Sequence, residues 1–321
     1  MREFAFELTV CAALEAQSDG IIARQLGTHN RIVDVVELHP GPEFDERTNI
    51  TPHAIPAPAI ESDVGVGRAR RPKNAFDTRP DRAEGLADRA VELGFFENEY
   101  RNGRRYVRQT VRYPDWVGEL RAFENKPDLG RPGDLELQLR KDVSLSLFDS
   151  VVLVTESYVT GAHLNRIPEQ VGVWRFDPDA GEFTVIREAT RLPSTGTGIA
   201  VLDESPARTD IEPVPVDEKA TLRRRIAERA YGKGWRPETV SGCAQLRPDS
   251  PPFDDARDVL PYCDWKERFV DCARECGPEC GGYSSADVPA IDTDSVRDRR
   301  SPWISDPEGV KRRQVGLDQF S

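Results

Sequence analysis

The sequence predicts an α/β fold in which a mixed β-sheet is flanked by helices. Residues 31–38 form a short run rich in β-branched side chains, which is typical of a strand. Residues 114–126 contain short apolar segments, and a helical run at 134–148 and an apolar run at 151–154 follow them. Strand-type and helix-type segments are therefore expected to share one core.

The composition is that of a globular but very polar protein. Among 321 residues, 38% are hydrophobic and 31% are charged, and the formal net charge is −12. This length allows two domains or one large decorated domain. The acidic, lysine-poor composition resembles that of halophilic archaea, although a GC-rich genome also favours arginine over lysine. The negative charge argues against tight, non-specific coating of DNA, but local basic patches and bound metal can offset it.

The sequence predicts neither a membrane segment nor a secretion signal. Its apolar runs are all well below the roughly 18–20 residues of a membrane span, and residues 1–4 lead into a short apolar run with no cleavage signature. We therefore expect a soluble, cytoplasmic protein with no membrane partner. In that compartment the 6 cysteines are expected to be thiols or metal ligands rather than disulfides.

Periodicity and turn residues predict the remaining elements. Asn102-Gly103 is the strongest two-residue hairpin signal in the chain. We expect helices at 2–26, 81–95, 162–170 and 218–231, hairpins at 97–112 and 171–187, and mostly loop at 39–80 and 189–217.

A candidate metal site lies in residues 114–126. A turn at Gly118 would form a hairpin that brings Asp115 to the sheet edge where Glu124 lies. Glu124 and Lys126 are two residues apart and therefore share one face of a strand. Two carboxylates and an ammonium group suit Mg²⁺ or Mn²⁺ and the hydrolysis of a phosphodiester. The alternative is an ordinary hairpin with a solvated ion pair.

The pair Pro114-Asp115, followed by Glu124-Asn125-Lys126, resembles the signature of the PD-(D/E)XK nuclease superfamily, which has a restriction-endonuclease-like core. In that fold a helix follows the E-x-K strand, and the run at 134–148 matches it. Gln138 and Lys141 on this run are similar to the polar helix residues of the RecB-like branch.

This resemblance implies a deoxyribonuclease that depends on Mg²⁺ or Mn²⁺. Asp115 and Glu124 would hold the metal. Lys126 would orient the attacking water and stabilise the charge that develops on the phosphate. Gln138 would contact the substrate or brace the site.

Other acidic residues compete for roles in the same site. Asp34, on the strand predicted at 31–38, is a rival for the metal-binding aspartate. We rank it second to Asp115, because it would make 40–113 an insertion between two active-site strands. Nucleases of this superfamily often carry a glutamate on the first core helix, and Glu7 or Glu15 would match it. The alternative for either is a surface acid on an amphipathic helix.

The predicted hairpin at 97–112, together with the helix before it, resembles a fragment of a winged helix. Arginines interleaved with an aromatic residue suit phosphate contact. The candidate DNA-binding residues are Arg104, Arg105, Tyr106, Arg108 and Arg112. The alternative is a solvated hairpin.

The late cysteines form a candidate second metal site. Cys272, Cys276 and Cys280 are spaced four apart, and with Cys263 they could bind Zn²⁺. Some RecB-like nucleases join one early cysteine to three late ones, so the resemblance also implies a [4Fe–4S] cluster held by Cys11 and the late trio. The spacing departs from that of the family. A third possibility is free cysteines that recur along one helix face.

The C-terminal tail resembles the motif by which replication and repair proteins dock on the sliding clamp. Gln314, Leu317 and Phe320 follow the pattern Q-x-x-L-x-x-F, with Ser321 where the usual motif has a second aromatic residue. The clamp is therefore an expected partner in addition to DNA.

The expected architecture is a PD-(D/E)XK core with an inserted helix–hairpin element and a cysteine-rich C-terminal region. Its parts are a nuclease-like core at 1–38 and 107–190, an insertion at 39–106, a linker and helix at 191–242, a metal-binding region at 243–283 and a tail at 284–321. The expected function is metal-dependent DNA cleavage in repair or replication. The alternatives are a catalytically silent DNA-binding accessory protein with this fold, or a metal-stabilised interaction protein.

Overall fold

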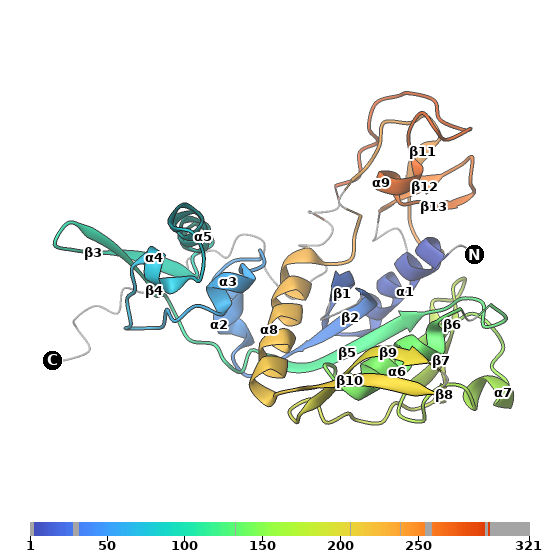
Figure 1. Cartoon of the computed structure of the whole chain (residues 1–321). Coiled ribbons are helices and arrows are strands. Elements are labelled where there is room, and N and C mark those ends of the chain that lie inside the picture. The colour runs from blue at the N-terminus through green and yellow to red at the C-terminus, as the bar shows by residue number, and fades with distance from the viewer. Residues whose placement is uncertain are drawn as a thin grey trace.

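The centre of the molecule is a six-stranded mixed sheet with the strand order β1-β2-β5-β6-β7-β8 (Figure 1). The computed structural model describes residues 3–27, 32–131, 133–205, 207–237, 239–253, 259–292 and 295. The sheet strands are β1 (Ile21–Gly27), β2 (Ile32–Pro40), β5 (Val117–Asn125), β6 (Ser150–Thr155), β7 (Gly172–Asp177) and β8 (Glu182–Arg187).

Antiparallel and parallel pairs are combined in this sheet. β2 is antiparallel to both β1 and β5, whereas β5, β6 and β7 are parallel and β8 turns back antiparallel. The parallel pair β5–β6 is connected through the helix α6 (Leu135–Leu145). The α/β class and the mixed sheet flanked by helices are therefore confirmed.

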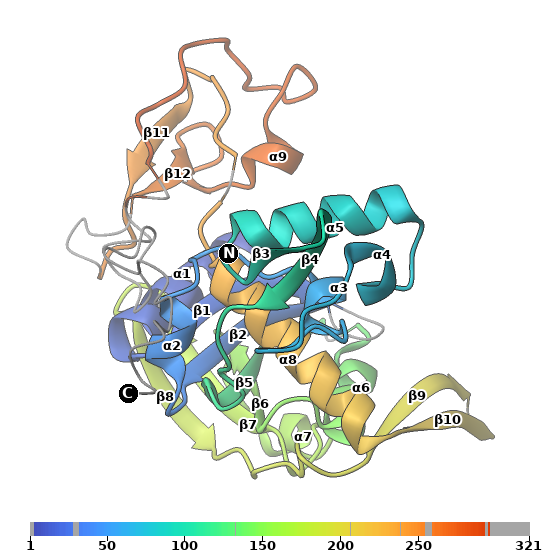
Figure 2. The same ribbon diagram turned by 90° about the vertical axis from the view of Figure 1, so that its left-hand side faces the viewer.

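Helices cover both faces of the sheet. α1 (Glu3–Gln17) packs on one face, where Phe6 and Val10 join Val35 and Phe123 in one apolar cluster. α8 (Val216–Lys233) and α6 pack on the other face, and Figure 2 shows α8 running across β1 and β2. Because both faces are covered, β6 is buried along its whole length, as is usual for a central strand between two helical layers.

Among the described residues, no helix combines the length and the apolar character needed to cross a lipid bilayer.

A segment between β2 and β5 extends away from the sheet (Figure 1). It contains α2 (Phe44–Thr48), α3 (Ala57–Ile60), α4 (Pro72–Ala75), α5 (Pro80–Glu92), β3 (Phe96–Arg101) and β4 (Arg104–Gln109). The hairpin expected at Asn102-Gly103 is present, with φ values of 50° and 71° that suit a tight two-residue turn. The boundary expected at residue 106 falls inside β4, so the inserted segment continues to Trp116.

The last part of the described chain adds two small units. One is a two-stranded ribbon of β9 (Gly198–Ser205) and β10 (Arg208–Val214), which leads into α8. Earlier in the chain, the short helix α7 (Gly161–Leu164) precedes β7. The cysteine-rich module lies beyond the end of α8 and beside α1 (Figure 1). It consists of β11 (Leu246–Asp249), β12 (Leu260–Cys263), β13 (Arg268–Phe269) and α9 (Cys272–Glu275).

Several expected elements are wrong. The helix expected at 2–26 ends at Gln17, because Ser18 and Gly20 make a turn in which the Gly20 N–H donates to Ser18 Oγ at 2.9 Å. The residues after this turn then form β1 and pair with β2.

The expected loop at 189–217 contains the ribbon β9–β10. The helix expected at 218–231 is present as α8, and its Ala227 and Ala230 are fully buried in the core.

The hairpin expected at Gly118 is also wrong. β5 runs without a turn from Val117 to Asn125. Gly118 is required for another reason, because a Cβ there would lie 2.6 Å from the Pro40 carbonyl oxygen of the neighbouring strand. Asp115 therefore lies at the opposite end of β5 from Glu124.

Candidate active site

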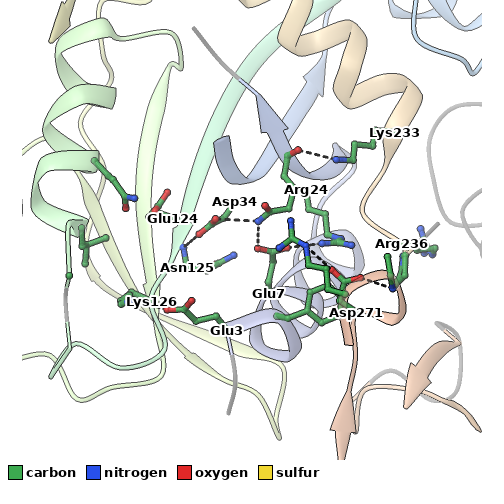
Figure 3. Close-up of a pocket in the computed structure, with 18 of the residues that line it drawn as sticks. Glu3, Glu7, Arg24, Asp34, Glu124, Asn125, Lys126, Lys233, Arg236 and Asp271 are labelled. Atoms are coloured by element: carbon green, nitrogen blue, oxygen red, sulfur yellow. Dashed lines mark hydrogen bonds and ion pairs between the residues drawn. The ribbon is translucent and has the colours of Figure 1, made fainter. Parts of the chain in front are cut away.

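A pocket of about 670 Å³ opens beside α1, where β2 begins and β5 ends (Figure 3). Most of the polar side chains that line it are of three kinds. The carboxylates are Glu3, Glu7, Asp34, Glu124, Asp134 and Asp271, the amides are Gln25, Asn125 and Gln138, and the cations are Arg24, Lys126, Lys233, Arg236 and Arg274. Of the site residues expected from sequence, the structure brings Glu7, Asp34, Glu124, Lys126 and Gln138 together here.

The pairing of β2 with β5 sets Asp34 beside Glu124. Val35 is the register partner of Phe123, so the residues that follow along β5 come alongside Asp34. Asp34 Oδ2 accepts the Asn125 backbone N–H at 2.9 Å, which fixes the aspartate against the E-x-K strand. Glu124 is buried at the same edge. Two acidic side chains on adjacent strands are therefore held together by the sheet itself.

Glu7 reaches this group from α1. Its Oε1 lies 3.0 Å from Arg24 Nη1, and its Oε2 accepts from Gln25 Nε2 at 2.7 Å. Burial and the nearby Asp34 carboxylate raise the pKa of Glu7 from its ordinary value of 4.5 to about 7, and these effects outweigh the opposing effect of Arg24. The pocket therefore contains a carboxyl group that changes charge near neutral pH.

This raised pKa predicts a pH-dependent loss of stability in the metal-free protein. Glu7 stabilises the fold in its protonated form, so its contribution is full below pH 4.5 and is lost as the pH rises through about 7. Relative to Glu7→Gln, which stays neutral, the wild type should lose up to about 3 kcal/mol between pH 4.5 and pH 8. Urea unfolding of both proteins in EDTA measures this difference. Glu92→Gln, at an exposed position, is the matched control, and the same pH response in all three proteins would contradict the prediction.

Lys126 lies at the rim of the pocket. Its Nζ is 2.6 Å from Oε1 of Glu3, the exposed first residue of α1. The Glu3 side chain is 68% exposed, and ion pairs of this kind contribute at most about 1 kcal/mol. Another anion can therefore replace Glu3 at low cost.

Amide side chains complete the polar lining. Gln138 projects from the first half of α6, and Asn125 lies between Glu124 and Lys126. Asn125 is only 6% exposed, and within the described part of the chain neither of its side-chain polar atoms has a hydrogen-bond partner. A buried amide without a partner is costly, so this site is built to receive a polar group or an ion.

Asp115 is not part of the pocket. It is exposed in the turn before β5, where its N–H donates to Glu43 Oε2 at 2.8 Å. From Asp115 to Glu124, nine residues at about 3.3 Å each correspond to roughly 30 Å along an extended chain. One metal ion cannot contact both carboxylates, and the aspartate that lies beside Glu124 is Asp34 rather than Asp115.

A wall of cations from the C-terminal half of the chain was not expected from the sequence. Lys233 and Arg236 come from the end of α8 and the residues after it, and Arg274 comes from α9 in the cysteine-rich module. Glu15 does not line the pocket; its carboxylate holds buried Arg236, with Arg236 Nη2 2.5 Å from Glu15 Oε2. Two segments far from β5 in sequence, the end of α8 and α9, therefore bring positive charge to the pocket, and Figure 3 shows Lys233 and Arg236 on the side opposite β5.

The basic residues of the hairpin lie outside this pocket. Arg105 pairs with Glu84 and Asp88 of α5 at 3.0 and 2.6 Å. Arg108 pairs with Glu97 across the hairpin at 2.6 Å. These acids balance much of the charge that was expected to contact DNA, while Arg104 and Arg112 are exposed and Tyr106 stacks with Arg101.

The cysteine-rich module gathers most of the late cysteines. Cys243, Cys263 and Cys272 are buried in one small core, Cys276 packs against it, and Cys280 is half-buried. Burial and the neighbouring Cys272 raise the pKa of Cys276 to about 12, so its thiol is protonated when no metal is bound. Cys11 belongs to a different apolar cluster, between α1 and the sheet, and is not brought to this group.

The clamp-like residues Gln314, Leu317 and Phe320 lie outside the described residues. Across the described ranges, no three or more His, Cys, Asp or Glu side chains are gathered as a group that could hold a metal ion by themselves. Magnesium commonly uses only one or two protein carboxylates and completes its coordination with water and phosphate. The pair Asp34 and Glu124, together with the partnerless amide of Asn125, fits that requirement.

Comparison with known proteins identifies the family. Residues 21–285 match the model of a family of unknown function, DUF5787. The chain belongs to this family. The matched residues include Asp34, Glu124, Lys126 and the late cysteines, whereas Glu7 precedes them. Neither a curated protein nor a solved structure matches the chain.

Proposed function

We propose that this member of the DUF5787 family is a metal-dependent deoxyribonuclease with a PD-(D/E)XK core. The observation that carries the proposal is the convergence of Asp34, Glu124 and Lys126 on one pocket from two paired strands. The catalytic set would be Asp34, Glu124 and Lys126, with Glu7, Gln138 and Asn125 around it.

The order of the elements supports this assignment. A first helix bearing Glu7 precedes the strand with Asp34, then come the E-x-K strand β5, the helix α6 and the buried parallel strand β6. The superfamily resemblance implies the same order of acidic helix, aspartate strand, E-x-K strand, helix and core strand. The inserted segment then separates two active-site strands, as expected if Asp34 is the metal ligand.

The donors fit a hard divalent cation. Asp34 and Glu124 would hold Mg²⁺ or Mn²⁺, because carboxylate oxygens are the ligands these ions prefer. When bound, such an ion polarises the scissile phosphate and lowers the pKa of a coordinated water. Lys126 would leave Glu3 to contact a phosphate oxygen and to orient the water that attacks.

The surrounding cations suit a polyanionic substrate. Lys233 and Arg236 lie on the side of the pocket opposite β5 (Figure 3), and Arg274 also lines the pocket. These cations would contact phosphates on either side of the scissile bond. Arg274 could exchange its present partner Asp271, which lies 3.6 Å away, for a phosphate, because the Arg274 side chain is 81% exposed. Together with a bound divalent ion, these cations would offset the carboxylates that line the same pocket.

Lys126→Ala is expected to reduce DNA cleavage by about 10²- to 10³-fold, since it removes a charge stabiliser from the reacting phosphate. The assay is cleavage of labelled single- and double-stranded DNA in high KCl with Mg²⁺ or Mn²⁺, and EDTA should abolish it. Lys73→Ala, at an exposed position on α4, is the matched control. Equal rates for wild type and Lys126→Ala would remove Lys126 from the mechanism, and absence of cleavage by the wild type would overturn the proposal.

A DNA-binding accessory protein with the same fold is the second candidate. The ion pair between Lys126 and Glu3 favours it, because the catalytic ammonium is engaged in the absence of substrate. Equilibrium binding to the same labelled DNA separates the two functions. A protein that binds DNA through the cationic wall and never cuts it would be this accessory protein.

A further inference from the structure

Gln25 occupies an unusual position in the middle of β1. Its neighbours Arg24 and Leu26 pair with Val35 and Val33, so Gln25 lies opposite Asp34. Its φ of 54° is in the left-handed region, which residues other than glycine adopt infrequently and which is exceptional within a strand. Such conformations persist only where surrounding structure imposes them, and they concentrate at functional sites.

The end of α8 imposes this conformation. Lys233 Nζ donates to the Gln25 carbonyl oxygen at 2.9 Å. The preceding residue is held on both sides, because the Arg24 N–H donates to the Gly234 carbonyl at 3.2 Å and Arg24 Nε donates to the Trp235 carbonyl at 2.7 Å. Contacts about 210 residues away in sequence thus direct the Gln25 side chain into the pocket.

The Gln25 amide lies between two carboxylates. Its Nε2 donates to Glu7 Oε2 at 2.7 Å and to Asp34 Oδ1 at 3.3 Å. The amide hydrogens therefore place a partial positive charge where two negative groups converge. The same side chain carries a carbonyl oxygen, which is a ligand type that Mg²⁺ and Mn²⁺ accept.

We propose that Gln25 belongs to the metal site. Its carboxamide holds Glu7 and Asp34 together before a metal binds, and its oxygen is a further ligand for the bound divalent ion. This inference rests on the proposed function, since it concerns the metal of that same site. Gln25 is a positioning residue for the acidic pair and an additional oxygen donor. It explains why a strained backbone is retained at this one point of β1.

The test is calorimetric titration of Mn²⁺ into the metal-free, full-length protein in high KCl. Gln25→Met keeps the length of the side chain without the amide, and Gln25→Gly removes the side chain while suiting the positive φ. Gln25→Glu restores an oxygen at the same position. Asp34→Asn is the reference for loss of the site. Urea unfolding of each variant confirms that it folds.

Gln25→Met and Gln25→Gly are both expected to bind Mn²⁺ about 10- to 100-fold more weakly than the wild type, which is the usual cost of losing a residue that supports a metal site. Gln25→Glu should bind at least as tightly as the wild type. If Gln25 only supported the fold, Gln25→Glu would not restore the affinity for Mn²⁺. Gln25→Gly, which relieves the backbone strain, would then not weaken that affinity. Wild-type affinity in Gln25→Met, with affinity lost in Asp34→Asn, would overturn the inference.

The same titration separates this inference from the nuclease proposal. A wild type that binds Mn²⁺ in a Gln25-dependent manner but cuts no DNA would overturn the nuclease activity alone. A wild type that cuts DNA, with Mn²⁺ affinity independent of residue 25, would overturn the role of Gln25 alone. A wild type that binds no Mn²⁺ would overturn both.

Discussion

Asp34→Asn is expected to reduce metal-dependent DNA cleavage by about 100-fold or more, whereas Asp115→Asn is expected to leave the rate unchanged. Removing a metal carboxylate forfeits several kcal/mol of charge stabilisation in the transition state, and each 1.36 kcal/mol is tenfold in rate. Of these two aspartates, only Asp34 lies in the pocket with Glu124. Initial rates on labelled DNA with saturating Mn²⁺ measure the effect.

The two substitutions form a matched pair, since each removes one carboxylate charge with little change in volume. Asparagine at position 34 still offers a carbonyl oxygen to the Asn125 N–H, so the fold should be retained. At position 115 the contact with Glu43 is made by the backbone N–H and does not depend on the side chain. A larger loss in Asp115→Asn than in Asp34→Asn would refute the site as described.

Arg47→Ala is expected to lower the free energy of unfolding by about 3–5 kcal/mol, the cost of breaking a buried ion pair. Arg47, on α2 of the inserted segment, and Glu228, on α8, are 0% and 1% exposed, and Nη2 lies 2.8 Å from Oε2. The Arg47 guanidinium also donates to the Thr51 carbonyl at 2.6 Å and lies 3.8 Å from the centre of the Tyr231 ring. The substitution leaves Glu228 buried and unpaired. Urea unfolding measures the loss.

Two controls isolate the buried charge. Arg89→Ala breaks the exposed pair with Glu92 on α5, and it should cost at most about 1 kcal/mol. Arg47→Met combined with Glu228→Leu replaces both charges by apolar groups, and it should recover much of the lost stability. If the double variant were as unstable as Arg47→Ala, the loss would come from packing and not from the unpaired charge.

The pair Arg47–Glu228 shows how the inserted segment is attached to the core. Arg47 joins the segment to α8, and α8 also supplies Lys233, which holds the Gln25 backbone at the pocket. Folding of the insertion onto α8 and formation of the pocket are therefore connected through one helix.

Local sequence pattern was sufficient for several elements of the core. The β-branched run around Asp34, the helix that carries Gln138 and the apolar run of β6 all appear where periodicity predicts them. The spacing of Glu124 and Lys126 also indicated two side chains with a common direction on one strand. In each case the signal lies within a few residues, because strand and helix periods are local properties of the chain.

Only the tertiary structure decided which aspartate joins Glu124. The hydrogen bond between the Asn125 N–H and Asp34 connects residues 91 apart, and it follows from the register of β2 against β5. The sequence order favoured Asp115, because a short hairpin is the simplest way to bring two nearby acids together. Gly118 has no room for a side chain, so β5 packs directly against β2 without a turn. The long insertion between these two strands leaves the sheet after β2 and returns to it at β5.

The role of Gln25 was hidden for a related reason. Two polar residues, Arg24 and Gln25, interrupt the apolar run that begins at Ile21, and this is the one local sign that the strand borders a site. Their conformation depends on contacts from Lys233 to Trp235, about 210 residues later. The sequence by itself determined that β2, α6 and β6 are a strand, a helix and a strand, and that Glu124 and Lys126 lie two residues apart at the end of β5. Strand register and the packing of α1 and α8, which depend on contacts between distant segments, decided which side chains share the pocket.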